Sequence, residues 1–190
     1  MTFPRCCRPA SWLLAVALLA WGALFAARPA WADPVELKSL SVKRGEDGVL
    51  LSFTAQFELP HPVEEALLKG VPLHFVAEAS LYRARWYWRD VHVGSATRTW
   101  RLAYQPLTRK YRVSLGGLSQ GFDDLSEALA VVRTGTDWKI AELSQLEGDG
   151  RHYVEFSYHL DTTQLPRPMQ IGFSTQPEWT LAVERSVRLD

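Results

Sequence analysis

Hydrophobic and polar residues alternate along most of the chain beyond residue 35. A repeat of two is typical of a β-strand that buries one face and exposes the other, because successive side chains point to opposite sides of a sheet. The turn-forming segment 45–48 separates two such runs, as expected for a hairpin. The alternation predicts strands at 35–43, 51–59, 73–81 and 154–160, with shorter closing strands at 169–173 and 179–187.

Two short segments have helical patterns instead. Residues 62–69 stop at Gly70, a residue type favoured just past the end of a helix. A second helix is expected to begin at Asp124, with Glu127 at the spacing of a capping box. Its apolar stripe consists of Leu125, Ala128, Leu129 and Val132. The predicted fold is mainly β, an antiparallel sheet or β-sandwich with two short helices, and the alternative is an α+β fold.

The first 32 residues differ from the rest in charge and hydropathy. Two arginines precede an apolar run over 12–27, which the tripeptide Ala30-Trp31-Ala32 follows. A basic start, an apolar centre and small residues at Ala30 and Ala32 are the three parts of a secretory signal. We therefore predict cleavage after Ala32 and a single periplasmic β-rich domain over 33–190. The alternative is an inner-membrane anchor formed by 12–27, although about 16 apolar residues are few for a ~20-residue span.

Residues that carry metal or catalytic chemistry are scarce. Both cysteines, Cys6 and Cys7, lie within the predicted signal, so the mature domain would have no disulfide, no cysteine ligand and no cysteine nucleophile. No two of its five histidines have the i, i+2 or i, i+4 spacing common among metal ligands. Motifs of hydrolases, zinc proteases and nucleotide-binding loops are missing too. We expect no metal, no cofactor and no enzymatic activity, with an enzyme of unrecognised type as the alternative.

The net charge of zero hides two opposite charge balances. Three of the 21 basic residues lie in the first 32 positions, which contain no carboxylate, so the remaining chain has 18 basic and 21 acidic residues. The segment 83–112 carries eight basic groups and one carboxylate, Asp90. The rest of the mature chain has ten basic and 20 acidic groups. Such asymmetry indicates either a surface for an anionic partner or a segment that acidic residues elsewhere neutralise.

The alternation assigns these cations to one face of the predicted sheet. In three consecutive segments between 82 and 115, apolar and aromatic residues occupy one parity and most cations the other. We therefore expect Trp86, Trp88 and Trp100 to be buried. Like charges opposite one another destabilise a sheet, so a partner or carboxylates elsewhere in the chain should neutralise the cations. The candidate binding residues are Arg83, Arg85, Arg89, Arg101, Lys110 and Arg112.

Five stretches of the mature chain carry a family resemblance. They are LYRARWYW at 81–88, RTWRLAY at 98–104, LTRKYRVS with the following GGL at 107–118, the helical segment 122–129, and LDTTQLPRP at 160–168. Together they resemble the Gram-negative exported family known as domain of unknown function 4390. The resemblance covers nearly all of the mature chain and departs from the family at Arg89, where a bulky apolar residue is expected. It implies an exported protein whose gene tends to lie beside a membrane sensor-kinase pair, and it implies no catalytic residue, because the family has none defined.

These observations predict a periplasmic, non-catalytic binding or accessory domain that presents an arginine-rich sheet face. The gene neighbourhood that the resemblance implies points to an accessory or sensory role beside a membrane sensor system. The expected partner is a membrane-associated protein or an anionic envelope component, and nucleic acid is not expected in this compartment. The alternatives are an enzyme of unrecognised type and a structural envelope component. An open arginine face would favour binding, whereas a deep pocket with converging polar groups would favour an enzyme.

Overall fold

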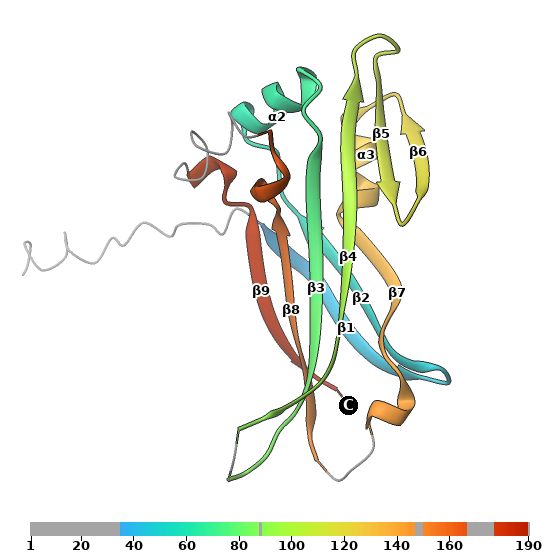
Figure 1. Ribbon diagram of the computed structural model, residues 1–190, viewed down its shortest axis with the longest axis vertical. Coiled ribbons are helices and arrows are strands. Elements are labelled where there is room, and N and C mark those ends of the chain that lie inside the picture. The colour runs from blue at the N-terminus through green and yellow to red at the C-terminus, as the bar shows by residue number, and fades with distance from the viewer. Residues whose placement is uncertain (1–34, 88, 147–149, 167–176, 190) are drawn as a thin grey trace, which may run out of the picture. The chain divides into compact units, whose positions relative to one another are not determined.

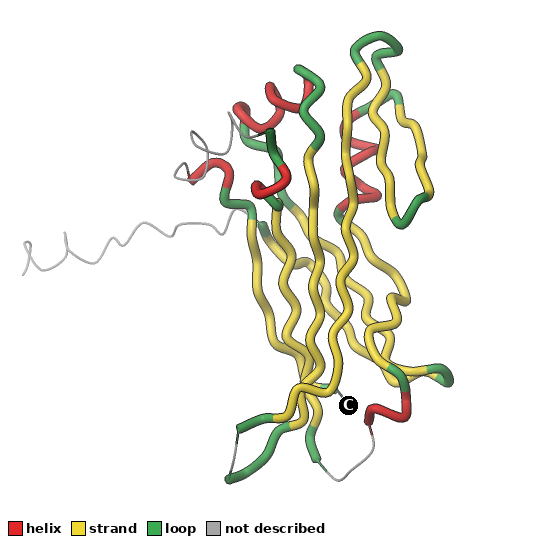
Figure 2. Tube along the Cα trace, viewed as in Figure 1, coloured by secondary structure: helices red, strands yellow, loops and turns green. Residues whose placement is uncertain are grey.

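The computed structural model describes residues 35–87, 89–146, 150–166 and 177–189 (Figure 1). All of them belong to the compact unit Asp33–Asp190. Their strands form two antiparallel sheets, drawn as yellow segments in Figure 2. The smaller sheet has the order β1-β2-β7, with β1 at Glu36–Gly45, β2 at Gly48–Gln56 and β7 at Thr134–Ala141.

The larger sheet has six strands in the order β6-β5-β4-β3-β8-β9. Among the described residues, two short α-helices and three 3-10 turns connect the strands. The predicted mainly β fold with antiparallel strands and two short helices is therefore confirmed, and the strands form two sheets. The strands are β3 (Leu73–Arg83), β4 (Val91–Gln105), β5 (Lys110–Leu115), β6 (Leu118–Phe122), β8 (His152–Leu160) and β9 (Ala182–Arg188), the helices are α2 (His61–Leu68) and α3 (Leu125–Val132), and the 3-10 turns are η1 (Leu143–Leu146), η2 (Thr162–Gln164) and η3 (Pro177–Trp179).

The two sheets pack against each other around Phe53 of β2. Its ring meets the edge of Trp100 of β4 with centroids 6.0 Å apart, and its centroid lies 4.8 Å from that of Phe156 of β8. All three side chains are almost inaccessible to solvent. Tyr158 lies beside them, and its hydroxyl donates a hydrogen bond of 3.1 Å to the carbonyl oxygen of Val132. Aromatic rings from both sheets thus interdigitate, and the buried hydroxyl keeps a partner.

Strand β7 is not predicted by the alternation of the sequence. Its residue Asp137 has a φ of 45°, and the pairing of β2 with β7 shifts register between Leu51 and Phe53. Such a bulge interrupts the repeat of two on which the prediction depends. A Cβ atom at Gly135 would lie 2.4 Å from the Phe53 ring. Glycine therefore weakens the strand signal in the sequence and at the same time lets the central ring approach the backbone of β7.

The other predicted elements are confirmed with shifted ends. Strands β1, β2, β3 and β8 correspond to the four main alternating runs. The last strand is shorter than predicted, because Trp179 lies in a 3-10 turn and β9 begins at Ala182. The predicted strand at 169–173 lies outside the described residues. Strand β6, a five-residue edge strand, adds a pairing that the sequence does not predict.

The ends of the helices differ in how well the sequence predicts them. After α2, Gly70 has a φ of 87°, and its N–H donates to the carbonyl of Leu67 while the N–H of Val71 donates to that of Ala66. These two bonds form the Schellman motif that glycine favours. Helix α3 begins after Asp124 as predicted, but the Asp124 side chain makes no capping hydrogen bond. The capping box expected there is therefore wrong.

Candidate binding surfaces

The structure divides the six candidate basic residues into two groups. Arg101, Lys110 and Arg112 lie on β4 and β5, on the face of the larger sheet that points away from the smaller sheet. Arg83 ends β3, whereas Arg85 and Arg89 lie in the connection that follows it. The expected single arginine-rich sheet face is therefore wrong. Two separate cationic regions replace it.

The division follows from where β3 stops. The pairing of β3 with β4 shifts register between Leu81 and Tyr82, and β3 ends at Arg83. The described residues between Arg83 and Val91 have no strand partner. The alternation predicted for 82–89 therefore does not assign them to a face of the sheet. Arg83 itself shares the inward parity of the fully buried Leu81. It therefore occupies the opposite face of the sheet from Arg101, not the same one.

We call Arg101, Lys110 and Arg112 the outer basic patch. Each cation faces a neutral neighbour across the register: Arg101 opposes His74 and Ser114, and Arg112 opposes Ala103 and Gly121. Lys110 forms an exposed ion pair of 3.1 Å with Asp123. Since no two of these cations stand directly opposite, the like-charge destabilisation expected from the sequence does not arise.

Carboxylates occupy other strands of the same face. Glu78 of β3 opposes Thr97 and Ser157, and Glu155 of β8 opposes Ser80 and Ser186. These groups border a shallow hollow of about 440 Å³ over β3, β8 and β9. Among the described residues, these carboxylates therefore lie beside serine and threonine residues. They do not cover the arginines of the outer basic patch.

The second cationic region surrounds two exposed aromatic rings. The side chain of Trp86 is 92% exposed and that of Tyr87 is 69% exposed, and their rings meet edge to face with centroids 5.0 Å apart. The prediction that Trp86 is buried is wrong, because its segment is a loop and not a strand. The prediction that Trp100 is buried is confirmed, because this residue is 1% exposed. Trp88 lies outside the described residues.

The loop that bears these rings is held by Asp90. One carboxylate oxygen accepts a hydrogen bond of 3.0 Å from the backbone N–H of Arg85, and the other accepts one of 2.8 Å from the hydroxyl of Tyr153 on β8. These bonds stabilise the carboxylate and lower the pKa of Asp90. The same contact raises the pKa of Tyr153 to about 12, so its hydroxyl remains a donor. The one acidic group of the segment 83–112 therefore anchors the loop.

Arg151 joins the loop from a distant part of the chain. Its carbonyl oxygen accepts a hydrogen bond of 2.8 Å from the N–H of Ala84, and its side chain is exposed. An open hollow of about 710 Å³ is lined by residues 83–87 and 150–151. Arg151 is not among the candidate residues predicted from the sequence, because it lies outside the basic segment 83–112. No local pattern in the sequence identifies Arg151, because the pairing of β8 with β3 brings it to this loop.

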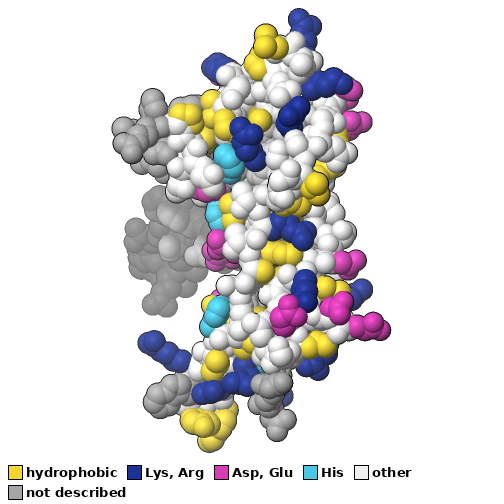
Figure 3. Space-filling model, turned by 45° about the vertical axis from the view of Figure 1, so that its right-hand side comes forward, with side chains coloured by type: hydrophobic (Ala, Val, Ile, Leu, Met, Phe, Trp, Pro, Cys, Tyr) yellow, Lys and Arg dark blue, Asp and Glu magenta, His cyan; other side chains and the backbone are white. Residues whose placement is uncertain are grey.

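We call Arg85, Trp86, Tyr87, Arg89 and Arg151 the arginine–aromatic end. Within the described residues, no carboxylate lies within ion-pair distance of its three arginines; Glu147 and Asp149 of the adjoining segment fall outside that part. Figure 3 shows exposed hydrophobic side chains at the lower end of the molecule with Lys and Arg beside them. The lower end in Figure 1 carries the β3–β4 connection.

His152 is a buried histidine that lies close to arginines at this end of the molecule. Its side chain is 8% exposed, and its Nε2 atom has no hydrogen-bond partner among the described residues. Burial and the nearby guanidinium groups of Arg83 and Arg44 lower the pKa of His152. A neutral imidazole is therefore favoured there, because a further positive charge would be both desolvated and repelled.

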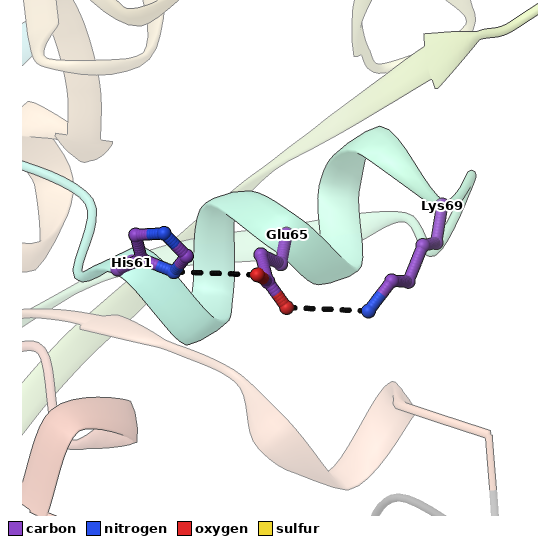
Figure 4. Close-up of polar contacts among 3 residues, drawn as sticks. All are labelled: His61, Glu65 and Lys69. Carbon is purple, nitrogen blue, oxygen red and sulfur yellow. Dashed lines mark hydrogen bonds and ion pairs between the residues drawn. The ribbon is translucent and has the colours of Figure 1, made fainter.

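Other polar clusters are explained by local structure. Figure 4 shows Glu65 between His61 and Lys69 on α2, with contacts of 3.6 Å from His61 Nδ1 and 3.2 Å from Lys69 Nζ. An exposed charged pair one helical turn apart, such as Lys69 with Glu65, contributes about 0.3–0.5 kcal/mol, so it supports the helix. No group of three or more His, Cys, Asp or Glu suited to a metal ion occurs among the described residues.

The predicted export signal falls outside the described part of the chain. Its cleavage residues Ala30 and Ala32 and its apolar run 12–27 are not described. Among the residues that are described, no helix combines the length and apolar character needed to cross a membrane.

Comparison with known proteins gives one match. The sequence model of the family described as Domain of unknown function (DUF4390) matches residues 32–188. Neither the curated proteins nor the solved structures give a match. The matched range contains both cationic regions.

Proposed function

Because this chain belongs to the family Domain of unknown function (DUF4390), whose description assigns no activity, we propose a function from its geometry. The protein is an exported, non-catalytic accessory domain. It binds an anionic partner in the cell envelope through the arginine–aromatic end. A place beside a membrane sensor system is consistent with that role.

The observation that carries the proposal is the exposure of Trp86 beside arginines that have no acidic partner among the described residues. A tryptophan side chain that is 92% exposed on a folded domain is unusual, and clustered exposed aromatic residues mark interaction sites. Arg85, Arg89 and Arg151 have no acidic partner in the described structure, while Asp90 is engaged in holding the loop. Aromatic and arginine side chains are also the residue types enriched in the centres of binding surfaces.

The outer basic patch fits a binding site less well. Its Lys110 is already paired with Asp123, and its register gives each arginine a neutral neighbour. The aromatic residues that alternate with its cations are turned inward, as Trp100 shows. The patch therefore offers charge alone, and an exposed charge contributes little binding energy when salt screens it.

The hollows of the structure favour binding over catalysis. The hollow beside the arginine–aromatic end is open and has cations and aromatic rings along it. Among the described residues, its ionisable lining consists of arginines and Tyr87, with no carboxylate or histidine that could act as a general base. An enzyme of unrecognised type would need groups outside this site.

Export is part of the proposal, and intact-mass measurement tests it. The full chain should be expressed in a Gram-negative host and its periplasmic extract analysed. A mass that lacks residues 1–32 supports a cleaved signal. Full-length mass in the membrane fraction would instead establish an anchor over 12–27.

Binding is tested with the purified protein and native membranes of such a host. The R85S/R151S double variant should associate with the membranes far less than the unmodified protein. The R101S/R112S double variant removes the same charge from the outer basic patch and should retain association. Equal binding by all three proteins would contradict the proposal, and loss only in R101S/R112S would move the binding site to the sheet face.

A further inference from the structure

We infer that the partner of the arginine–aromatic end is the surface of a lipid bilayer that contains anionic phospholipids. This inference rests on the proposed function and names the partner. Trp86 and Tyr87 enter the interfacial region of the bilayer, while Arg85, Arg89 and Arg151 contact phosphate groups. The domain therefore docks with the β3–β4 connection toward the membrane.

The shape of the region favours a membrane over a protein. The two rings are exposed on a loop between strands, so the apolar surface that they present is small. A buried aromatic residue contributes roughly 150–250 Å², whereas a stable protein interface needs about 800 Å² from each partner. Two rings fall well short of that area, but a bilayer needs no complementary pocket. Tryptophan and tyrosine concentrate at membrane interfaces because their rings are apolar and their polar atoms stay hydrated.

The charges favour an anionic bilayer. Each cation held close to such a surface strengthens binding about fivefold at moderate salt. Guanidinium groups also donate paired hydrogen bonds to phosphate oxygens, which suits the headgroups of phospholipids. Three exposed arginines around two rings combine the apolar and electrostatic parts that together give stable surface binding.

The loop is constrained before it meets a membrane. Asp90 bridges the N–H of Arg85 to the Tyr153 hydroxyl, and the N–H of Ala84 donates a hydrogen bond to the carbonyl oxygen of Arg151, which immediately precedes β8. The backbone of Arg85 and of Arg151 is therefore held in place before any ligand binds. A constrained loop loses less conformational freedom on binding, which favours association.

The molecule contains a matched control at the other end of β4. The hairpin between β4 and β5 bears Leu107, whose side chain is fully exposed, together with the exposed Arg109. Strand β4 has 15 residues, which separates the two loops by about 50 Å along the strand. The R109S/R112S variant, in this hairpin and the adjoining strand, removes the same net charge as R85S/R151S, and Leu107→Ala removes an exposed apolar side chain as Trp86→Ala does.

The test is flotation of the full protein with protein-free vesicles. One set contains phosphatidylcholine alone, and the other contains phosphatidylglycerol as well. We expect binding to the anionic vesicles. R85S/R151S should weaken it about 25-fold, at about fivefold for each arginine, and Trp86→Ala should weaken it about tenfold. The controls R109S/R112S and Leu107→Ala should bind within about twofold of the unmodified protein, because surface changes remote from a contact have small effects.

Each other outcome overturns a defined part of the account. If R85S/R151S and R109S/R112S weaken vesicle binding equally, the attraction is a general effect of charge. That result would overturn docking through the arginine–aromatic end. Binding to native membranes but to neither kind of vesicle would overturn the lipid assignment and leave a protein or glycan as the partner. Binding to neither membranes nor vesicles would overturn both the inference and the proposed function. Circular dichroism of each variant establishes that it is folded.

Discussion

The outer basic patch and the arginine–aromatic end carry the same type of cation in different surroundings. On β4, Arg101 points outward while its neighbours Trp100 and Leu102 point into the core. Beyond β3, Arg85 and Trp86 are both exposed. A strand separates apolar from charged side chains because its two faces meet different environments. A loop does not impose that separation, so it can display both kinds of side chain together.

The difference has a consequence for recognition. Cations on a regular sheet face can be tolerated when neutral residues oppose them, as Ser114 opposes Arg101. They need not have a partner. Neutral neighbours do not explain the exposure of a tryptophan, because any apolar contact would stabilise its ring relative to water. Among the described residues, the exposed ring therefore distinguishes a binding surface from a region of charge alone.

The largest expected effect is on the free energy of unfolding, when Trp100 and Trp86 are each replaced with alanine. Trp100→Ala removes a buried ring beside Phe53 and should lower the free energy of unfolding by about 3–5 kcal/mol. Trp86→Ala removes an exposed ring and should change it by less than about 0.5 kcal/mol. Urea denaturation of both variants measures the contrast. A similar loss in the two variants would mean that Trp86 packs in the fold.

A smaller effect is expected from two arginines three positions apart on β4. Arg98 lies on the inward parity, with its guanidinium carbon 5.1 Å from the centroid of the Trp138 ring, and burial lowers its pKa. Arg98→Ser should destabilise the fold by about 1–2 kcal/mol, since a partly desolvated cation–π contact is lost. Arg101→Ser should cost less than about 0.5 kcal/mol, as expected for an exposed position. The reverse order in chemical denaturation would contradict the assignment of faces.

A still smaller effect concerns pH and the arginine–aromatic end. The pKa of His152 is lowered from its ordinary 6.5, so the unfolded chain binds a proton more readily than the folded protein. The contribution of neutral His152 to the free energy of unfolding is therefore fully present at neutral pH. It is lost as the pH falls below 6.5, by at most about 1.4 kcal/mol for each pH unit. His152→Gln should make the stability less dependent on pH in this range. An unchanged pH profile in thermal denaturation would show that the imidazole is not held in its neutral form.

The sequence predicts the regular parts of this molecule and fails where regularity ends. Alternation identifies β2, β3 and β8 because one face of each strand is buried against the opposite sheet. It misses β7, where the bulge at Asp137 and the glycine at Gly135 interrupt the repeat. The helix end at Gly70 is predictable because a positive φ strongly favours glycine.

The candidate site was predictable in composition but not in arrangement. The cluster of cations and the presence of Arg85 are visible in the sequence, yet extending the strand alternation to residue 89 places Trp86 in the core. Strand length is set by partner strands far along the chain, which the local pattern does not contain. The role of Asp90 depends on Tyr153, which is 63 positions away, and Arg151 depends on the pairing of β8 with β3.

The most direct test of the central claim is hydrogen–deuterium exchange of the full protein with and without native membranes. Slower exchange should appear in peptides that cover 83–91 and 150–153, because contact with the membrane excludes water from both loops. Peptides that cover the outer basic patch, 99–114, should exchange at the same rate in both conditions. Slower exchange confined to 99–114, with none at the arginine–aromatic end, would contradict the account.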